Sequence, residues 1–176
     1  DGSYTAADVT ITGNAASDAF GGAIASGDVN ADTKVDLVVG ATGYNPGAAA
    51  NTGRSYIFYN DGSIPTTAAT ADVTLTGNAA SDLFGGAIAT GDVNADSRVD
   101  VVIGASGYTT STGRAYVFYN DGSIPTTAGT ADITLTGEAT SNSFGSAIAT
   151  GDMNEDSKVD IIVGANGYTT STGRIY

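Results

Sequence analysis

An acidic nine-residue segment that occurs three times constrains what this chain can fold into. Its copies are residues 28–36, 92–100 and 152–160, which lie 64 and 60 residues apart. The difference of four residues falls in one stretch, where 44–54 replaces the shorter 108–114. A nearly fixed period of this size is typical of a solenoid, a propeller or another repeat array.

The side chains of this segment follow a calcium-loop pattern. Oxygen-bearing side chains stand at positions 1, 3, 5 and 9 of every copy, and position 7 is always basic. Ca²⁺ takes about 6–8 oxygen ligands, so a short loop must turn alternate side chains inward and add a backbone carbonyl, usually from position 7. A basic residue can offer only that carbonyl, and we expect its side chain to point into solvent. The pattern predicts about three Ca²⁺ per chain, held by Asp28, Asn30, Asp32, Lys34, Asp36, Asp92, Asn94, Asp96, Arg98, Asp100, Asp152, Asn154, Asp156, Lys158 and Asp160.

The alternative is a polar turn whose carboxylates are solvated or accept hydrogen bonds from nearby amides. Carboxylates at this spacing repel one another unless a cation neutralises them, and the threefold recurrence favours calcium. The loop is not an EF-hand, because strand-like segments flank it and its twelfth position lacks the bidentate Glu. Its sixth position carries Thr33, Ser97 or Ser157 instead of Gly. A side chain there costs roughly 1 kcal/mol if the backbone needs a positive φ.

Four strand-like runs follow one another within a repeat. In the middle copy they are residues 84–90, which are small and apolar; 99–105, which are β-branched and nearly continuous; 114–119, which end in aromatics; and 133–136, which alternate with Thr. A continuous β-branched run is typical of a strand buried on both faces. Four strands per repeat make a propeller blade, so we expect an all-β chain of three four-stranded antiparallel blades.

At these positions the chain resembles a known family. The residues Phe84-Gly85-Gly86, then the acidic segment, then Gly104-Ala105-Ser106 are similar to the FG-GAP repeat of integrin α-subunit β-propellers and of many secreted bacterial proteins. In that family the loop between the first two strands of a blade binds Ca²⁺, so the resemblance implies the ligands named above. The Pro of the family motif is replaced by Thr42, Ser106 or Asn166. The other repeats match at Phe20, Gly21, Gly40 and Ala41 and at Phe144, Gly145, Gly164 and Ala165.

The repeat boundaries predict how the blades are divided. We expect an N-terminal outer strand at 1–13, blades at 14–77 and 78–137, and a third blade at 138–176 that lacks its own outer strand. Propellers usually have about 4–8 blades, so three blades form a partial propeller or one that is closed by association of chains. In the closed form the N-terminal strand of one chain would complete a blade of the next. The alternative is a piece cut from a longer array.

Composition excludes several classes of function. With 19 acidic and 6 basic residues the net charge is −13, which argues against nucleic acid and anionic membranes as partners. The apolar runs are too short for membrane insertion. The chain has no His and no Cys, so the usual pairs of nucleophile and base are missing. We therefore expect that the chain is not an enzyme. Without disulfides, millimolar Ca²⁺ outside cells would supply cross-links, which indicates an extracellular or cell-surface location.

Two functions of different class remain open. The first is a calcium-stabilised module for protein interaction or adhesion, with an unknown protein or glycan as ligand. The second is a structural element that self-associates by strand exchange into a closed oligomer or filament. Tyr44, Tyr108 and Tyr168 recur at one place in each repeat, either as an aromatic rim for a ligand or, as we favour, in packing between blades. We expect Arg54, Arg114 and Arg174, which also recur, to bridge to acids of neighbouring blades.

Overall fold

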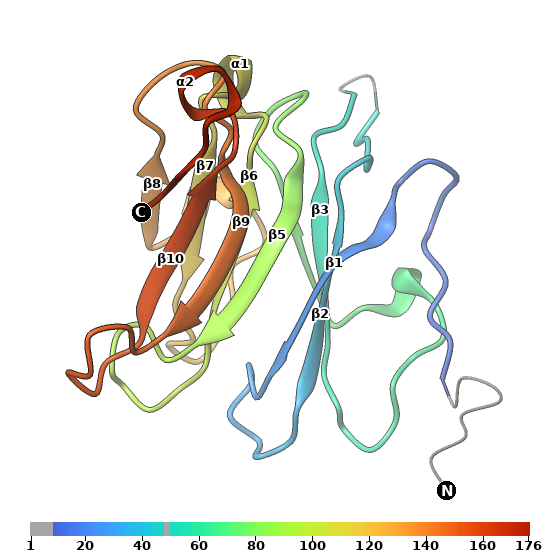
Figure 1. The fold of residues 1–176 in the computed structure, drawn as a ribbon. Helices are drawn as coiled ribbons and strands as arrows, with labels where there is room; N and C mark the ends of the chain where they lie inside the picture. Colours follow the sequence, from blue (N-terminus) through green and yellow to red (C-terminus); the bar gives the residue numbers. More distant parts are fainter. Residues whose placement is uncertain (1–8, 48–49) are drawn as a thin grey trace, which may run out of the picture.

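The computed structural model describes residues 9–47 and 50–176, which form three antiparallel sheets in chain order (Figure 1). The first sheet comprises β1 (Phe20–Gly27), β2 (Asp36–Ala41), β3 (Arg54–Phe58) and β4 (Val73–Thr76). The second comprises β5 (Phe84–Gly91), β6 (Asp100–Ala105), β7 (Arg114–Phe118) and β8 (Ile133–Thr136). The third comprises β9 (Phe144–Gly151), β10 (Asp160–Ala165) and β11 (Arg174–Ile175). The short turns between strands are η1 (Ala68–Thr70), α1 (Tyr108–Ser111), η2 (Ala128–Thr130) and α2 (Tyr168–Ser171).

Each sheet is a meander in which sequential strands pair. The first two sheets have strand orders β1-β2-β3-β4 and β5-β6-β7-β8, with equivalent registers such as Val38 opposite Ile57 and Val102 opposite Val117. All six residues of β6 are buried, as the β-branched run predicts. The third strand of the repeat is also largely buried, since four of the five residues of β7 are buried. Neighbouring sheets cover both of its faces.

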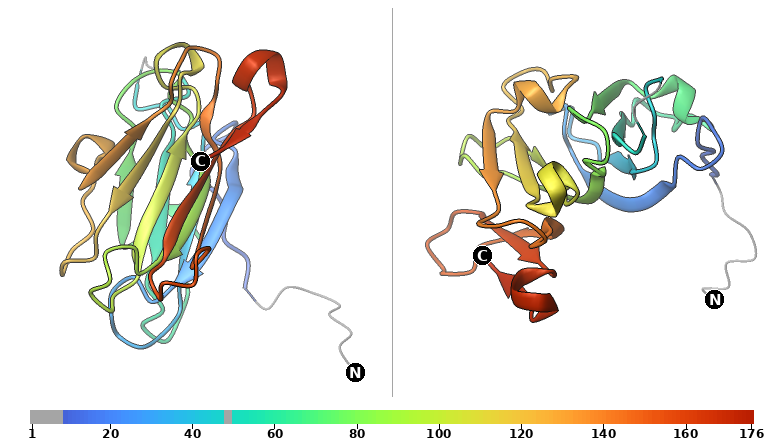
Figure 2. Two further views of the ribbon diagram at one scale, coloured as in Figure 1. Left: turned by 60° about the vertical axis from the view of Figure 1, so that its left-hand side comes forward. Right: turned by 90° about the horizontal axis from the view of Figure 1, so that it is seen from above.

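The three sheets stand side by side around an arc, with β1, β5 and β9 on its inner side (Figure 2, right). These inner strands are also linked by hydrogen bonds, since Thr90 Oγ1 donates to the carbonyl of Ser26 and Thr150 Oγ1 donates to that of Thr90, both at 2.8 Å. The first strands of neighbouring sheets therefore lie close together, which suits their many small residues. The architecture is that of a partial β-propeller, and the predicted all-β class is confirmed.

The core lies between sheets as well as within them. Phe84 and Ile88 of β5 join one apolar cluster with Val38, Ile57 and Leu75 of the first sheet. Phe84 also packs edge-on against the ring of Tyr116, with centroids 5.7 Å apart. Burial of this shared apolar surface is the main force that holds adjacent blades together.

The glycines of the repeat motif meet where one sheet contacts the next. An added Cβ on Gly40 would lie 2.0 Å from the carbonyl oxygen of Gly85, and one on Gly104 would lie 2.1 Å from that of Gly145. Short parallel bridges join Gly53 to Phe84 and Gly113 to Phe144 at the same contacts. The backbone of each blade thus approaches that of its neighbour too closely for any side chain.

Part of the predicted N-terminal strand, residues 1–8, lies outside the described residues. Of the remainder, Thr12 forms a parallel bridge with Thr67, and Ile11 packs against the apolar cluster of the first sheet. The division at residues 13, 77 and 137 stays a prediction. No helix in the described part of the chain is long and apolar enough to cross a lipid bilayer.

Candidate metal centre

The three acidic segments form the loops between the first and second strands of each sheet, at one common edge of the molecule (Figure 1). Each loop needs left-handed backbone at two positions. The sixth residues, Thr33, Ser97 and Ser157, have φ of 73°, 70° and 67°. Position 6 therefore does need a positive φ, and a residue other than Gly costs free energy there. The fourth residues also have positive φ, a feature that the sequence analysis missed, and they are Ala31, Ala95 and Glu155.

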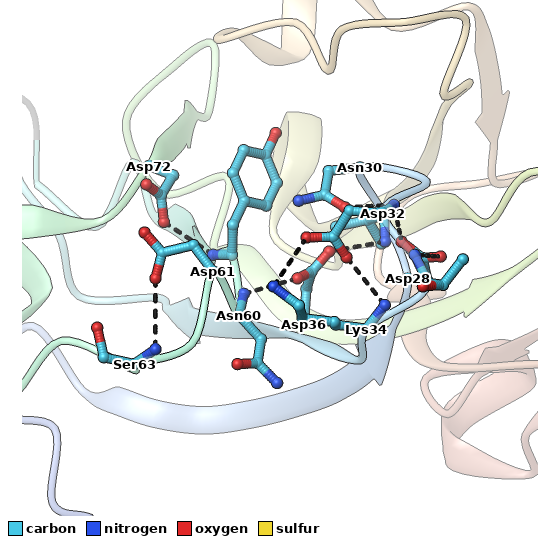
Figure 3. Close-up of polar contacts among 12 residues, drawn as sticks. Asp28, Asn30, Asp32, Lys34, Asp36, Asn60, Asp61, Ser63 and Asp72 are labelled. Atoms are coloured by element: carbon cyan, nitrogen blue, oxygen red, sulfur yellow. Dashed lines mark hydrogen bonds and ion pairs between the residues drawn. The ribbon is translucent and has the colours of Figure 1, made fainter.

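The same hydrogen bonds recur in all three loops, and Figure 3 shows them in the first. The carboxylate of Asp28 accepts from the amides of Asp32 and Thr33 at 3.0 and 2.8 Å. Asn30 Oδ1 accepts from the amide of Asp32 at 3.0 Å, and Asp32 Oδ1 accepts from that of Lys34 at 2.9 Å. The loops at 92–100 and 152–160 repeat these bonds within 0.1 Å. Positions 1, 3 and 5 therefore gather their oxygens around one turn.

Position 9 closes each loop, and in the first two loops it also ties the loop to the turn after the third strand. Asp36 Oδ2 accepts from the amide of Val29 at 2.9 Å, and its Oδ1 accepts from the amide of Asn60 at 2.8 Å. Asp100 repeats this arrangement with the amides of Val93 and Asn120. The sequence analysis missed the two Asn residues, whose signal is the Asn-Asp-Gly-Ser stretch that follows the third strand.

Burial raises the pKa of the Asp36 and Asp100 carboxyl groups. The hydrogen bonds from the backbone amides oppose this rise, and the neighbouring carboxylates at positions 1 and 5 add to it. Asp36 is 1% exposed and Asp100 is 0% exposed, so desolvation of the charged form is the dominant cause. A cation in the loop would favour the charged form.

The side chain at position 7 does not simply point into solvent. Lys34 Nζ lies 3.9 Å from Asp32 Oδ2, within its own loop. The guanidinium of Arg98 donates to the carbonyl of Asn120 at 3.2 Å. The expectation of a free side chain is thus wrong for Arg98, which ties its loop to the turn after β7.

The donor chemistry of these loops fits Ca²⁺, because positions 1, 3, 5 and 9 present only carboxylate and amide oxygens and no nitrogen or sulfur ligand. A carboxylate has about four lone-pair sites, so one or two amide bonds leave capacity for a cation. In the arrangement described, however, those oxygens face loop amides. Among residues 9–47 and 50–176, no group of three acidic side chains is arranged so that it could hold a metal ion. Calcium binding therefore stays a prediction.

A second recurring feature joins Tyr and Arg within each repeat. The Arg54 guanidinium stacks 3.6 Å from the centre of the Tyr44 ring, Arg114 does so at 3.6 Å on Tyr108, and Arg174 at 3.7 Å on Tyr168. Arg54 and Arg114 also donate from Nε to Oγ1 of Thr76 and Thr136. Each of these tyrosine rings thus packs on an arginine of its own repeat, and packing between blades stays a prediction.

The expected bridges from these arginines to acids of neighbouring blades are wrong. In the described part of the chain, Arg54 and Arg114 form no ion pair, and each is held by a Tyr ring and a Thr hydroxyl of its own sheet. Arg174 pairs with Glu138 at 3.0 Å, and both residues lie within the predicted third blade. A planar guanidinium stacks well on an aromatic ring, and each of these arginines stacks on the Tyr ring of its own repeat instead of pairing with an acid of a neighbouring blade.

Three antiparallel sheets of four, four and three strands stand around an arc, each with an acidic loop after its first strand, and define a repeat protein of the β-propeller type. The FG-GAP repeat family model matches residues 20–58, 84–118 and 144–176, which contain the first three strands of each sheet. The chain belongs to the FG-GAP repeat family.

Curated relatives share this region. The phosphatidylinositol-glycan-specific phospholipase D of Bos taurus is 32% identical over 157 residues, which is 83% of this chain and 18% of that protein. The enzyme of the same name from Rattus norvegicus is 34% identical over 155 residues, 82% of this chain and 18% of that protein. Integrin alpha-IIb of Mus musculus is 38% identical over 100 residues, 52% of this chain and 10% of that protein. The chain thus spans less than a fifth of the length of these relatives.

Proposed function

We propose that this chain is a calcium-binding FG-GAP module of an extracellular or cell-surface protein, where it serves protein interaction or adhesion. The observation that carries the proposal is the recurrence of one hydrogen-bond network in all three loops. In each loop the oxygens at positions 1, 3 and 5 surround the same turn, and Asp at position 9 anchors it. One Ca²⁺ per loop would replace part of the amide bonding and offset two of the three negative charges at the ligand positions.

The module is proposed to be non-catalytic. The chain has no His and no Cys, and its acids recur in equivalent structural roles, which supports a structural use. The relatives named phospholipase D are enzymes by name, and this chain matches 18% of their length. Whatever catalysis a whole protein of this kind performs would then belong to residues outside the module.

Calorimetric titration of the chain with Ca²⁺ tests the metal sites. We expect about three sites per chain, with dissociation constants on the order of 10⁻⁴–10⁻³ M, the range of extracellular modules. Asp96→Asn keeps an oxygen that can accept the amide bond of Arg98 and removes one negative charge. It should abolish one site, and combination with Asp32→Asn should abolish two. Asp121→Asn removes an exposed acid outside the loops and should leave all three.

The proposal fails if millimolar Ca²⁺ produces no binding heat and does not stabilise the fold. Binding that survives the combined Asp32, Asp96 and Asp156 to Asn changes would also count against it, because the sites would then lie elsewhere. Mg²⁺ in place of Ca²⁺ serves as a control for charge alone, since Mg²⁺ prefers a rigid octahedral site that these loops do not supply.

A further inference from the structure

The turn after the third strand places Asp directly before Gly in the first two sheets. Asp61-Gly62 follows β3 and Asp121-Gly122 follows β7. Because Gly has no side chain, its amide nitrogen can reach the side-chain carboxyl carbon of the Asp before it with little hindrance. A pair of this kind can rearrange to isoaspartate, in which the main chain runs through the Asp side chain. Both turns therefore have the sequence of a spontaneous modification site.

The amides of these two Gly residues are open to the reaction. Gly62 and Gly122 both have φ of 118°, and an added Cβ on either would meet nothing within 4 Å. Neither amide donates a hydrogen bond to any residue in the described part of the chain. Asp61 and Asp121 are exposed. The attacking nitrogen is thus unbound, water reaches the carboxyl group, and the backbone has room to move.

The carboxyl group of Asp61 is also turned toward this amide. The Ser63 amide donates to Asp61 Oδ1 at 3.4 Å (Figure 3). A bond from the amide two residues on is that of an Asx turn, which folds the carboxyl group back over the amide in between. Here that amide belongs to Gly62. Asp121 stands in the same sequence, Asn-Asp-Gly-Ser-Ile-Pro.

A third pair has a sequence suited to the same chemistry but a different structure. Asn166-Gly167 can form the same ring with loss of ammonia, and Asn166 is exposed. The amide of Gly167, however, donates to the carbonyl of Asn142 at 3.0 Å. An added Cβ on Gly167 would lie 1.9 Å from the carbonyl oxygen of Ser141, so this backbone has no room to move. The fold therefore protects Asn166.

The acidic loops are protected in a similar way. In each loop the amide that follows the Asp at position 5 donates to the carboxylate at position 1, at 2.8 Å. These amides belong to Thr33, Ser97 and Ser157. The structure, and not the sequence alone, thus distinguishes the two turns from the other acidic segments.

We infer that Asp61 and Asp121 are sites of spontaneous isoaspartate formation, and that this modification loosens the support of the first two acidic loops. The nitrogen of the Gly attacks Cγ of the Asp, the N–Cγ bond forms, and the carboxyl hydroxyl leaves as water. The product is a succinimide ring. Water then adds to the main-chain carbonyl of the Asp, and its bond to the Gly nitrogen breaks. One water is released and one is taken up, so the mass does not change.

The loops are affected because the modified residue follows the Asn that holds position 9. The amide of Asn120 donates to Asp100 Oδ1 at 2.9 Å, and its carbonyl accepts from Arg98 at 3.2 Å. Isoaspartate at Asp121 adds one atom to the backbone directly after this carbonyl. The first sheet has the equivalent bond from Asn60 to Asp36. The inference does not rest on the proposed function, since none of these contacts involves calcium.

Incubation of the folded chain at pH 5 and 37 °C tests the sites. Protein-isoaspartate methyltransferase with a labelled methyl donor detects isoaspartate, and peptide mapping locates it. We expect label at Asp61 and Asp121. Asp121→Glu should remove the label at that position and leave the label at Asp61, because a Glu side chain would have to close a larger ring. Glu keeps the charge of this exposed residue, and circular dichroism checks that the variant is folded.

The same incubation in guanidinium chloride gives the rates for the unfolded chain. Folding should slow deamidation of Asn166 roughly tenfold or more, since a hydrogen bond and close packing hold Gly167. It should slow isoaspartate formation at Asp61 and Asp121 much less. Deamidation raises the mass and the Asp reaction does not, so mass spectrometry separates the two. Folding that protects Asp61 and Asp121 as strongly as Asn166 would overturn the assigned sites.

Thermal unfolding in chelator tests the effect on the loops. The incubated wild type should melt about 2–4 °C below fresh wild type, the shift expected from loss of one hydrogen bond in a chain of this size. The double variant Asp61→Glu, Asp121→Glu should melt at the same temperature before and after incubation. Isoaspartate at both positions without a fall in melting temperature would overturn the predicted loss of support.

Discussion

At the scale of single residues, left-handed backbone recurs at defined places and few of them carry Gly. Ala95 and Ser97 stand two residues apart in the second loop with φ of 62° and 70°, and both other loops repeat the pair. A side chain in this region costs roughly 1 kcal/mol, which the amide bonds to the position 1 carboxylate offset. The loops therefore hold a strained turn in place with their own acids.

Replacing Ser97 with Gly should relieve part of this strain. We expect Ser97→Gly to raise the free energy of unfolding by up to about 1 kcal/mol, and Ser97→Val to lower it by a similar amount, because a β-branched residue tolerates left-handed backbone least. Urea unfolding without Ca²⁺ measures both changes. Ser123→Gly is the control, since Ser123 is exposed and is not among the residues with positive φ. A gain of the same size at Ser123 would contradict the strain explanation.

Asp82 is a buried acid whose pKa lies above its usual value of 3.8, chiefly because burial disfavours its charged form. Below pH 3.8 both the native and the unfolded states hold the proton, and this group does not affect stability. As the pH rises through the raised native pKa, the native state must ionise at a cost, so the contribution of Asp82 to stability becomes unfavourable.

Asp82→Asn should therefore raise the free energy of unfolding at pH 7 more than at pH 3.5. The third repeat already carries Asn142 at this position, 6% exposed, so an amide fits the site. Urea unfolding of wild type and variant at both pH values gives the difference, and Asp121→Asn controls for the loss of one negative charge. An equal effect at both pH values would show that the change acts through packing instead of ionisation.

At the scale of elements, the repeat motif is a device for contact between sheets. Gly104 lies in a strand whose six residues are all buried, and Gly145 of the next sheet contacts it by backbone. The conformational freedom of Gly is not needed there, but its lack of a side chain is. The Phe of the motif then fills the space beside the paired glycines.

Gly104→Ala should accordingly destabilise the chain by far more than the difference in strand propensity between Gly and Ala. Its Cβ would lie 2.1 Å from the Gly145 carbonyl oxygen, so the two sheets must separate, at a cost of roughly 1–3 kcal/mol or more. Thermal unfolding compared with Gly129→Ala and with Gly164→Ala, whose added Cβ would have its nearest atoms in its own sheet, measures the effect. Equally small losses of thermal stability for Gly104→Ala and Gly164→Ala would contradict the close approach of the second and third sheets.

The elements could be predicted well from the sequence, because the pattern of each strand is local. The runs at 84–90, 99–105 and 133–136 correspond to β5, β6 and β8 within one residue at either end. The residues that support the candidate site could not be predicted in this way, because their positions depend on which strands pair. Asn120 stands 20 residues from Asp100 and reaches it only after β6 and β7 pair. Likewise, the stacking of Arg114 on Tyr108 depends on the turn between β6 and β7, which no periodicity reveals.

At the scale of the whole molecule, charge is the dominant feature. Nine of the 19 acids stand at predicted ligand positions, and three bound Ca²⁺ would change the net charge from −13 to −7, since −13 + 6 = −7. Without cations the three loops repel one another along one edge of the arc. Such repulsion opposes the compact state and is screened by salt.

Chelation should therefore lower the melting temperature, and added NaCl should restore part of the loss. Free Ca²⁺ at 100 times its dissociation constant stabilises the fold by about 2.7 kcal/mol per site, or roughly 5–10 °C for a chain of this size. Differential scanning calorimetry in Ca²⁺, in chelator, and in chelator with NaCl separates specific binding from screening. If NaCl restored the whole loss, neutralisation of charge alone would explain the effect.

Among residues 9–47 and 50–176, the middle sheet is covered by a sheet on both faces, while the first and third sheets are each covered by a sheet on one. In an array stabilised by contacts between nearest neighbours, this asymmetry sets a gradient of local unfolding. Amide hydrogens of β6, where Val101, Val102 and Ile103 are all 0% exposed, should exchange slowest, and those of β9 and β10 should exchange faster. A further sheet packed against the first or the third sheet would slow hydrogen exchange in that sheet. The gradient of exchange across the three sheets therefore reports which of their faces are covered.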